Sequence, residues 1–99
     1  MAGARETVNV TATVLRLDRA ESGRLAALAS VQIEIADVAF VVHGVRIIRT
    51  GPRAHGIAAP CYRMATGRLA DAISLPPELT HAIVEVVLDE FDAFRGRGR

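Results

Sequence analysis

The residues of this sequence that could do chemistry are three histidines, one cysteine and a set of arginines. His43, His55, His81 and Cys61 are the possible metal ligands. They have neither the close paired spacing of a zinc finger nor the two histidines four residues apart on a helix that a metalloprotease needs. We therefore expect no metal site and no cofactor.

Cys61 and His55 make the sharpest hypothesis for catalysis, as a nucleophile and its base. On one strand they would face the same side but lie about 20 Å apart, beyond hydrogen-bond reach, unless the chain bends sharply at Pro60. Paired acids for hydrolysis and a glycine loop for phosphate do not occur in the sequence either. The sequence therefore predicts no enzyme and no small-molecule substrate.

Every basic residue in this chain is an arginine, twelve in all, and the net charge is +1. Guanidinium groups suit paired hydrogen bonds to phosphate, although a GC-rich coding genome alone gives the same bias. The arginines that we expect to contact phosphate lie near strand ends and in the C-terminal tail: Arg49, Arg53, Arg63, Arg68, Arg95 and Arg97. The alternative for each of these arginines is a charge that contacts only water. For Arg46, which lies inside a strand, the sequence does not decide between these two roles.

The elements that position these residues are mostly β-strands. Residues 7–14 alternate valine or alanine with threonine or asparagine, which predicts a half-buried strand. The phase changes near Arg16 and predicts a bulge there, while residues 18–23 are typical of a turn. Alternation resumes over residues 25–35, which predicts a second strand.

A third strand is expected over residues 38–50, before the turn at Gly51-Pro52. Simple alternation makes this strand apolar on both faces, with Phe40, Val42, Arg46 and Ile48 on one side and Val41, His43, Val45 and Ile47 on the other. A strand apolar on both faces is central in its sheet or covered twice. Because one helix cannot cover both faces, we expect a second subunit, through face packing or edge pairing. His43 is expected to be a partly buried structural imidazole.

The rest of the chain predicts two short strands and a helix. Residues 56–64 favour a fourth strand, which Pro60 restricts to an edge or a bulge, and residues 68–75 a possible fifth. From Glu78 to Phe94 the apolar residues recur at helical spacing. The predicted fold class is α+β, an antiparallel β-meander of four to five strands with a C-terminal α-helix, as a homodimer. Residues 1–94 form the single expected domain, and residues 95–99 a disordered Arg/Gly tail.

Composition limits the number of cores, the cellular compartment and the possible partners of this chain. A chain of 99 residues with 51 % hydrophobic content suffices for one core, and its four aromatic residues are too few for a stacking surface along single strands. The lone Cys61 excludes an intramolecular disulfide, and the sequence has neither a leader pattern nor an apolar run that could span a bilayer. We expect a cytoplasmic protein without a membrane partner.

Several segments together resemble the stage V sporulation protein G (SpoVG) family. They are "GRLAALASVQIE" (23–34), "FVVHGVRII" (40–48), the proline of "AAPCYR" (58–63), Gly67, Asp71 and "VVLDEF" (86–91). The similarity covers about residues 15–94, and the segment 40–48 is its most specific part. After the proline the family has Ser-Lys-Arg where this chain has Cys61-Tyr62-Arg63, which replaces a basic group with an aromatic one.

The resemblance implies a bacterial homodimer linked to septation and sporulation, which acts as a regulator by binding DNA or RNA and has no enzymatic activity. A meander alternates its turns, so we expect the arginines of residues 49–53 and 63–68 at opposite ends of the fourth strand, brought together only by a two-fold dimer. The outward side of the helix is acidic and repels phosphate. The alternative function is a dimeric protein-interaction module in cell division or development, which recognises a partner through its apolar sheet surface or its acidic helix.

Overall fold

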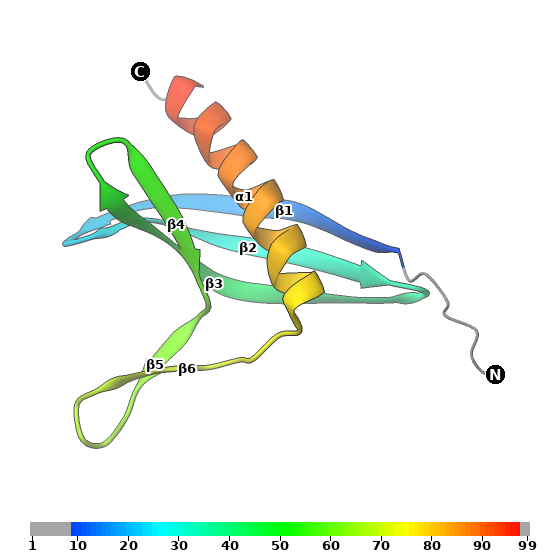
Figure 1. Cartoon of the computed structure of the whole chain (residues 1–99), viewed down its shortest axis with the longest axis horizontal. Helices are drawn as coiled ribbons and strands as arrows, with labels where there is room; N and C mark the ends of the chain where they lie inside the picture. The colour runs from blue at the N-terminus through cyan, green and yellow to red at the C-terminus, as the bar shows by residue number, and fades with distance from the viewer. Residues whose placement is uncertain (1–8, 98–99) are drawn as a thin grey trace.

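The computed structural model describes residues 9–97 and has an antiparallel sheet beside one helix (Figure 1). The sheet has the order β1-β2-β3-β4, with β1 (Val10–Ser22), β2 (Leu25–Ile35), β3 (Val38–Gly51) and β4 (Ala54–Ala58). A separate two-stranded sheet is formed by β5 (Cys61–Arg63) and β6 (Leu69–Asp71), and α1 (Pro77–Arg97) crosses one face of the larger sheet. The predicted α+β class, with an antiparallel meander and a C-terminal helix, is confirmed.

The core lies between α1 and the inner strands β2 and β3. Four helical residues spaced by four form the buried stripe of α1: Leu79, Ile83, Val87 and Phe91. The stripe packs on a sheet face whose buried members are Ala27, Ala29, Val31, Ile33, Val42, Val45 and Ile47. Burial of each valine or isoleucine side chain stabilises the fold by about 1.5–3 kcal/mol, and the small alanines let the helix approach β2 closely.

A bulge in β3 changes which residues face α1. Ala29 pairs with Val45 and Val31 with Val42, so His43 and Gly44 together stand opposite Ser30. Gly44 has φ +79°, a conformation that glycine adopts without a steric cost. The bulge puts Val42, Val45 and Ile47 on one face, which contradicts the simple alternation that grouped Val45 and Ile47 with Val41 and His43.

His43 consequently lies on the sheet face away from α1, where it is exposed. Its Nδ1 shares a 2.9 Å hydrogen bond with Oγ of Ser30, so the expectation of a partly buried imidazole is wrong. The two-sided apolar pattern of this strand was the reason to expect a second subunit. The bulge accounts for most of that pattern, because Val42 before it and Val45 and Ile47 after it all face the same core. On the outer face Val41 remains 38 % exposed, and the homodimer stays a prediction.

The strand expected over residues 56–64 is interrupted at Ala59-Pro60. β4 ends at Ala58, and β5 begins a hairpin that leaves the main sheet. Pro60 has no N–H for a ladder, and Nε of Arg46 donates to the carbonyl oxygen of Ala59 at 2.8 Å, which holds this corner. The meander therefore has four strands, the smaller of the two predicted numbers, and the possible fifth strand lies outside it. Residues 61–71, named the arm from here on, form a separate hairpin (Figure 1).

Several predicted boundaries are confirmed and two are wrong. β2 has its predicted bounds, and the register shift between Val14 and Arg16 is the predicted bulge. β1 continues through residues 18–22, which were expected to be a turn, because they pair with β2. α1 continues to Arg97 rather than ending at Phe94, so residues 95–97 are helical and not a disordered tail. Residues 98–99 lie outside the described part of the chain.

Candidate nucleic-acid interface

Three segments meet at one end of the main sheet. Antiparallel strands alternate their ends, so the β1–β2 turn and the β3–β4 turn lie at the same end. The C-terminal part of α1 reaches this end as well, because Phe91 contacts the ring of His55 and Phe94 lies under the guanidinium of Arg19. The arginines placed here are named the arginine end: Arg19, Arg24, Arg49, Arg53 and Arg95.

Arg49 joins the two turns to each other. Its Nη1 donates to the carbonyl oxygens of Gly23 at 3.2 Å and Leu25 at 3.4 Å. Its own carbonyl accepts a 3.1 Å hydrogen bond from Nε of Arg24. Arg49 therefore has a structural task in addition to the phosphate contact that the sequence predicted.

Arg53 is the most available of the predicted arginines at this end. It lies in the β3–β4 turn and is exposed. Within residues 9–97 it makes no hydrogen bond and no ion pair. Its five N–H donors can therefore reach an incoming phosphate without breaking a contact of the fold.

His55, Phe91 and Arg95 form a stack on the α1 side of the sheet. The rings of His55 and Phe91 meet edge to face with centroids 4.8 Å apart, and the guanidinium of Arg95 lies 5.6 Å from the Phe91 centroid. Burial lowers the pKa of His55 below its ordinary value of 6.5, and the charges of Arg95 and Arg49 lower it further. The opposing influence of Asp92 is the weakest of these causes, so His55 senses a positive potential at this end.

Arg19 and Arg24 belong to the arginine end but were not among the residues predicted from the sequence. Arg19 lies in β1 with its guanidinium 5.5 Å from the Phe94 ring centroid, and Arg24 lies in the β1–β2 turn. The turn at residues 23–24 is the signal in the sequence that could have found these two arginines. In an antiparallel sheet of this order, that turn lies beside the turn after β3. The first strand, expected to end before residue 18, continues to Ser22 and so places this turn later in the chain.

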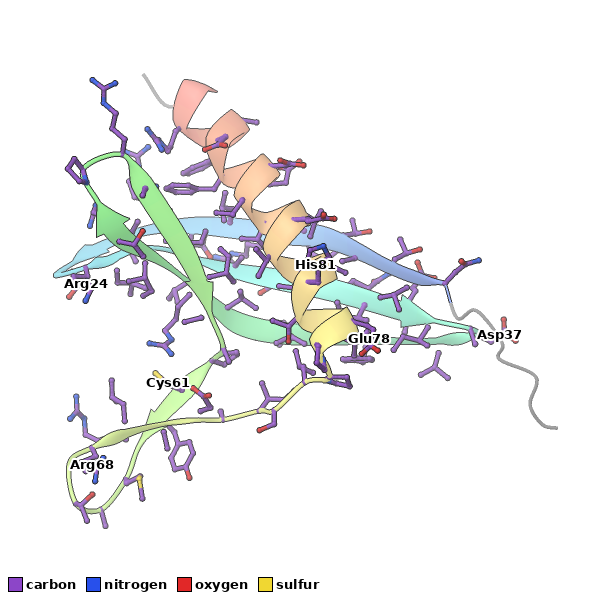
Figure 2. All side chains as sticks on the ribbon, viewed as in Figure 1. Arg24, Asp37, Cys61, Arg68, Glu78 and His81 are labelled. Carbon is purple, nitrogen blue, oxygen red and sulfur yellow. The ribbon has the colours of Figure 1, made fainter. Side chains whose placement is uncertain are left out.

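The arm carries the other two predicted arginines outside helix α1, Arg63 and Arg68. Nη1 of Arg63 donates to the carbonyl oxygen of Gly67 at 2.7 Å. The side chain of Arg68 is exposed and makes no hydrogen bond or ion pair among the described residues. Figure 2 shows Arg68 at the tip of the arm, separate from Arg24 on the main sheet, with Asp37 at the opposite end of the molecule. The structure therefore divides the predicted arginines between the arginine end and the arm. Arg97 is the last residue of α1.

The charges of α1 limit how a polyanion can approach. Its exposed acids are Glu78, Glu85, Asp89, Glu90 and Asp92. Asp92 Oδ1 lies 3.9 Å from Nη1 of Arg95, and Glu85 pairs with His81 at 3.2 Å. Carboxylates repel phosphate, so a nucleic acid would meet the two turns and the C-terminal tip of α1 rather than its side.

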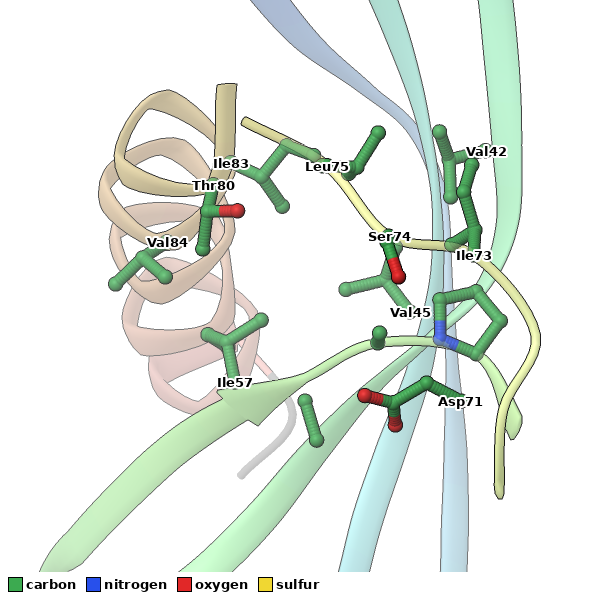
Figure 3. Close-up of a pocket in the computed structure, with 13 residues that line it drawn as sticks. Val42, Val45, Ile57, Asp71, Ile73, Ser74, Leu75, Thr80, Ile83 and Val84 are labelled. Atoms are coloured by element: carbon green, nitrogen blue, oxygen red, sulfur yellow. The ribbon is translucent and has the colours of Figure 1, made fainter. Parts of the chain in front are cut away.

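A pocket of about 360 Å³ lies where the arm leaves the body, between β3, β4, α1 and the segment before α1 (Figure 3). Its lining is mostly apolar, with Val42, Ile57 and Leu75 among the contributors. Asp71 is the charged residue of this lining, and a carboxylate disfavours phosphate. The pocket therefore does not extend the basic surface.

The residues considered for catalysis and metal binding are separated by the fold. His55 stacks on Phe91 from β4, whereas Cys61 begins β5 in the other sheet. Among residues 9–97 no group of three or more histidine, cysteine or carboxylate side chains could hold a metal ion. Within the same residues, no helix has the length and apolar character needed to cross a membrane.

No family model and no curated protein matches this chain.

Proposed function

We propose that this chain is a SpoVG-like regulator that binds DNA or RNA by its phosphates. The observation that carries the proposal is the convergence of arginines from β1, two turns and the C-terminal tip of α1 on one end of the sheet. Net charge alone gives no such field, because the chain as a whole carries only +1. A local cluster of this kind attracts phosphate at short range and within a Debye length of about 10 Å at 0.1 M salt.

The arrangement favours a backbone contact over base reading. Arginines on turns meet phosphates readily, whereas an acidic helix does not enter a groove. Burial is the main cause of the lowered pKa of His55, and the charges of Arg95 and Arg49, which lower it further, support a concentration of positive charge at this end before any ligand binds. The role in septation or sporulation and the absence of enzymatic activity are part of the proposal by resemblance to the family. The cytoplasmic location is part of it through the composition of the sequence.

The deciding experiment is a salt titration with duplex DNA, single-stranded DNA and RNA. If about four arginines contact phosphate, the logarithm of affinity for duplex should fall with the logarithm of salt concentration with a slope of about −3.6. No measurable binding at low salt would overturn the proposal.

Arg53→Glu and Arg68→Glu form a matched pair that separates the arginine end from the arm. Both side chains are exposed in hairpin turns and bond to nothing among the described residues, so neither change should alter the fold. A larger loss of affinity is expected for Arg53→Glu. A loss confined to Arg68→Glu would move the site to the arm.

The second candidate, a protein-interaction module, is supported by the apolar surface of the arm. Tyr62 is 53 % exposed, Met64 42 % and Leu69 56 %. The double change Tyr62→Ser with Leu69→Ser removes this surface without changing any charge. Unchanged nucleic-acid affinity in that variant is expected if the arginine end binds.

A further inference from the structure

The arm is joined to the rest of the molecule by two single segments, residues 59–60 and 72–76, named the neck from here on. The N–H of Ala72 donates to the carbonyl oxygen of Pro60 at 2.7 Å, so the two segments lie side by side. Nε of Arg46 holds the first segment through the carbonyl oxygen of Ala59 at 2.8 Å. The neck therefore has a defined shape, and the pocket of about 360 Å³ lies against it (Figure 3).

The floor of this pocket is apolar and belongs to the core. Val42, Val45 and Ile83 line the pocket and are buried. Ile57 of β4 and Leu75 of the neck, both partly buried, complete the apolar part of the lining. The volume is within the range of about 300–1,000 Å³ that small-molecule sites have. The apolar body of a small ligand could therefore leave water here.

Two polar side chains on one segment face this floor. The carboxylate of Asp71, the last residue of the arm, and the hydroxyl of Ser74 in the neck both point into the pocket (Figure 3). Neither side chain makes a hydrogen bond or an ion pair among the described residues. Both can accept hydrogen bonds from a ligand, and the carboxylate gives this side of the pocket a negative charge.

A free carboxylate beside an apolar floor selects a ligand with a positive head group and an apolar body. Anions are repelled by the same charge. Quaternary ammonium groups are usually held by aromatic rings, and the described lining of this pocket has none. A protonated primary amine instead brings three N–H donors, which suit a carboxylate and a hydroxyl. Every basic side chain of this protein is an arginine, so a side chain of a second copy cannot supply an alkyl ammonium.

We propose that the neck pocket binds a small primary amine with an apolar body. The ammonium pairs with the carboxylate of Asp71 and donates to the hydroxyl of Ser74, while the body lies on the buried floor. The ligand then contacts the arm, the neck, the main sheet and α1 at once. The site is separate from the arginine end and has the opposite charge.

The test compares hexylamine, 1-hexanol and hexanoate, which share one apolar body and differ in the head group. Binding to the full chain is followed by NMR titration of the methyl groups of Ile57, Leu75 and Ile83. Hexylamine should bind about fivefold more tightly than 1-hexanol, the strength of an ion pair at an open rim, and hexanoate should bind most weakly. Equal affinities for the three compounds, or shifts that avoid these methyl groups, would overturn the proposal.

Asp71→Asn removes the charge and keeps the size of the side chain. In this variant hexylamine should lose its fivefold advantage, while the affinity for 1-hexanol should stay that of the wild type. Asp37→Asn, at the opposite end of the molecule, is the matched control and should keep the advantage. Both carboxylates are exposed, so circular dichroism should show both variants folded. An advantage that persists in Asp71→Asn contradicts the proposal.

Two further compounds test the class of ligand. Hexyltrimethylammonium has the charge without N–H donors and should bind more weakly than hexylamine. Nα-acetyl-lysine methylamide carries the ammonium on a protein side chain and should also bind more weakly, because its peptide groups would lose water beside an apolar floor. Affinity equal to or above that of hexylamine would overturn the proposal, and for the lysine compound it would assign the pocket to a partner protein. All these measurements are made without nucleic acid, so they are independent of the arginine end.

Discussion

Arg24 and Arg49 are joined twice at the arginine end. Nε of Arg24 donates to the carbonyl oxygen of Arg49 at 3.1 Å, and the backbone N–H of Arg49 donates to the carbonyl oxygen of Arg24 at 2.8 Å. One backbone bond and one side-chain bond thus tie these two arginines together where the turns meet. Both charges add to the positive potential that an anion meets at this end of the sheet.

Asp92→Asn should strengthen nucleic-acid binding. The Asp92 carboxylate lies 3.9 Å from the Arg95 guanidinium and opposes phosphate at the arginine end. An exposed pair of this kind is worth at most about 1 kcal/mol, so affinity should rise up to about fivefold. Asp37→Asn, which removes the same charge at the opposite end, is the control and should change affinity little. Equal gains for both would indicate a response to net charge alone.

Arg49→Met should destabilise the fold as well as weaken binding. The change keeps most of the apolar stem but removes the donor to the carbonyls of Gly23 and Leu25. The expected loss is about 1–2 kcal/mol of unfolding free energy, measured by urea denaturation. Arg53→Met, at a site without such bonds among the described residues, should stay within about 0.5 kcal/mol of the wild type. Identical midpoints for the two variants would contradict the structural role of Arg49.

His55 should make the fold less stable in acid. Its pKa in the folded chain is lowered from 6.5, first by burial and then by Arg95 and Arg49, so the unfolded chain binds a proton more readily. The contribution of His55 to stability is complete above pH 6.5 and is lost as the pH falls through the folded pKa. The unfolding free energy of the wild type should therefore fall more between about pH 7 and more acidic solution than that of His55→Gln.

A constant difference between these two proteins across the pH range would contradict this prediction. NMR titration of the imidazole gives an independent check. Phosphate bound at the arginine end should raise the His55 pKa, because it offsets the charges of Arg95 and Arg49.

Gly44→Ala should destabilise the fold through backbone conformation rather than through a clash. A Cβ at this position would lie 3.7 Å from Cβ of Pro60, an ordinary contact, but φ is +79°. The expected cost is about 1–2 kcal/mol by thermal or urea unfolding. Gly51→Ala is the control, because its Cβ would also meet an ordinary contact, 3.6 Å from Cβ of Ala54, without a positive φ. A cost for Gly44→Ala no larger than the control would argue against the bulge.

Local pattern predicted most of the elements. Alternation over residues 25–35 and helical spacing after Glu78 both gave the observed type, because β2 and α1 each bury one face. The alternation pattern failed to predict the buried face where a bulge shifts its phase, and it failed to predict the sheet where the strand is interrupted. The bulge at His43-Gly44 moved Val45 and Ile47 to the core face, and Pro60 sent β5 out of the main sheet.

By itself the sequence determined most of the segments that form strands and helix, since periodicity is a local property of burial. It also placed Arg49 and Arg53 at one turn. Only the tertiary structure decided that Arg24 and Arg95, far apart in the chain, belong to the same end of the molecule as that turn. The physical reason is that antiparallel pairing and the path of α1 across the sheet set which chain ends meet, and neither leaves a local signal in the residues themselves.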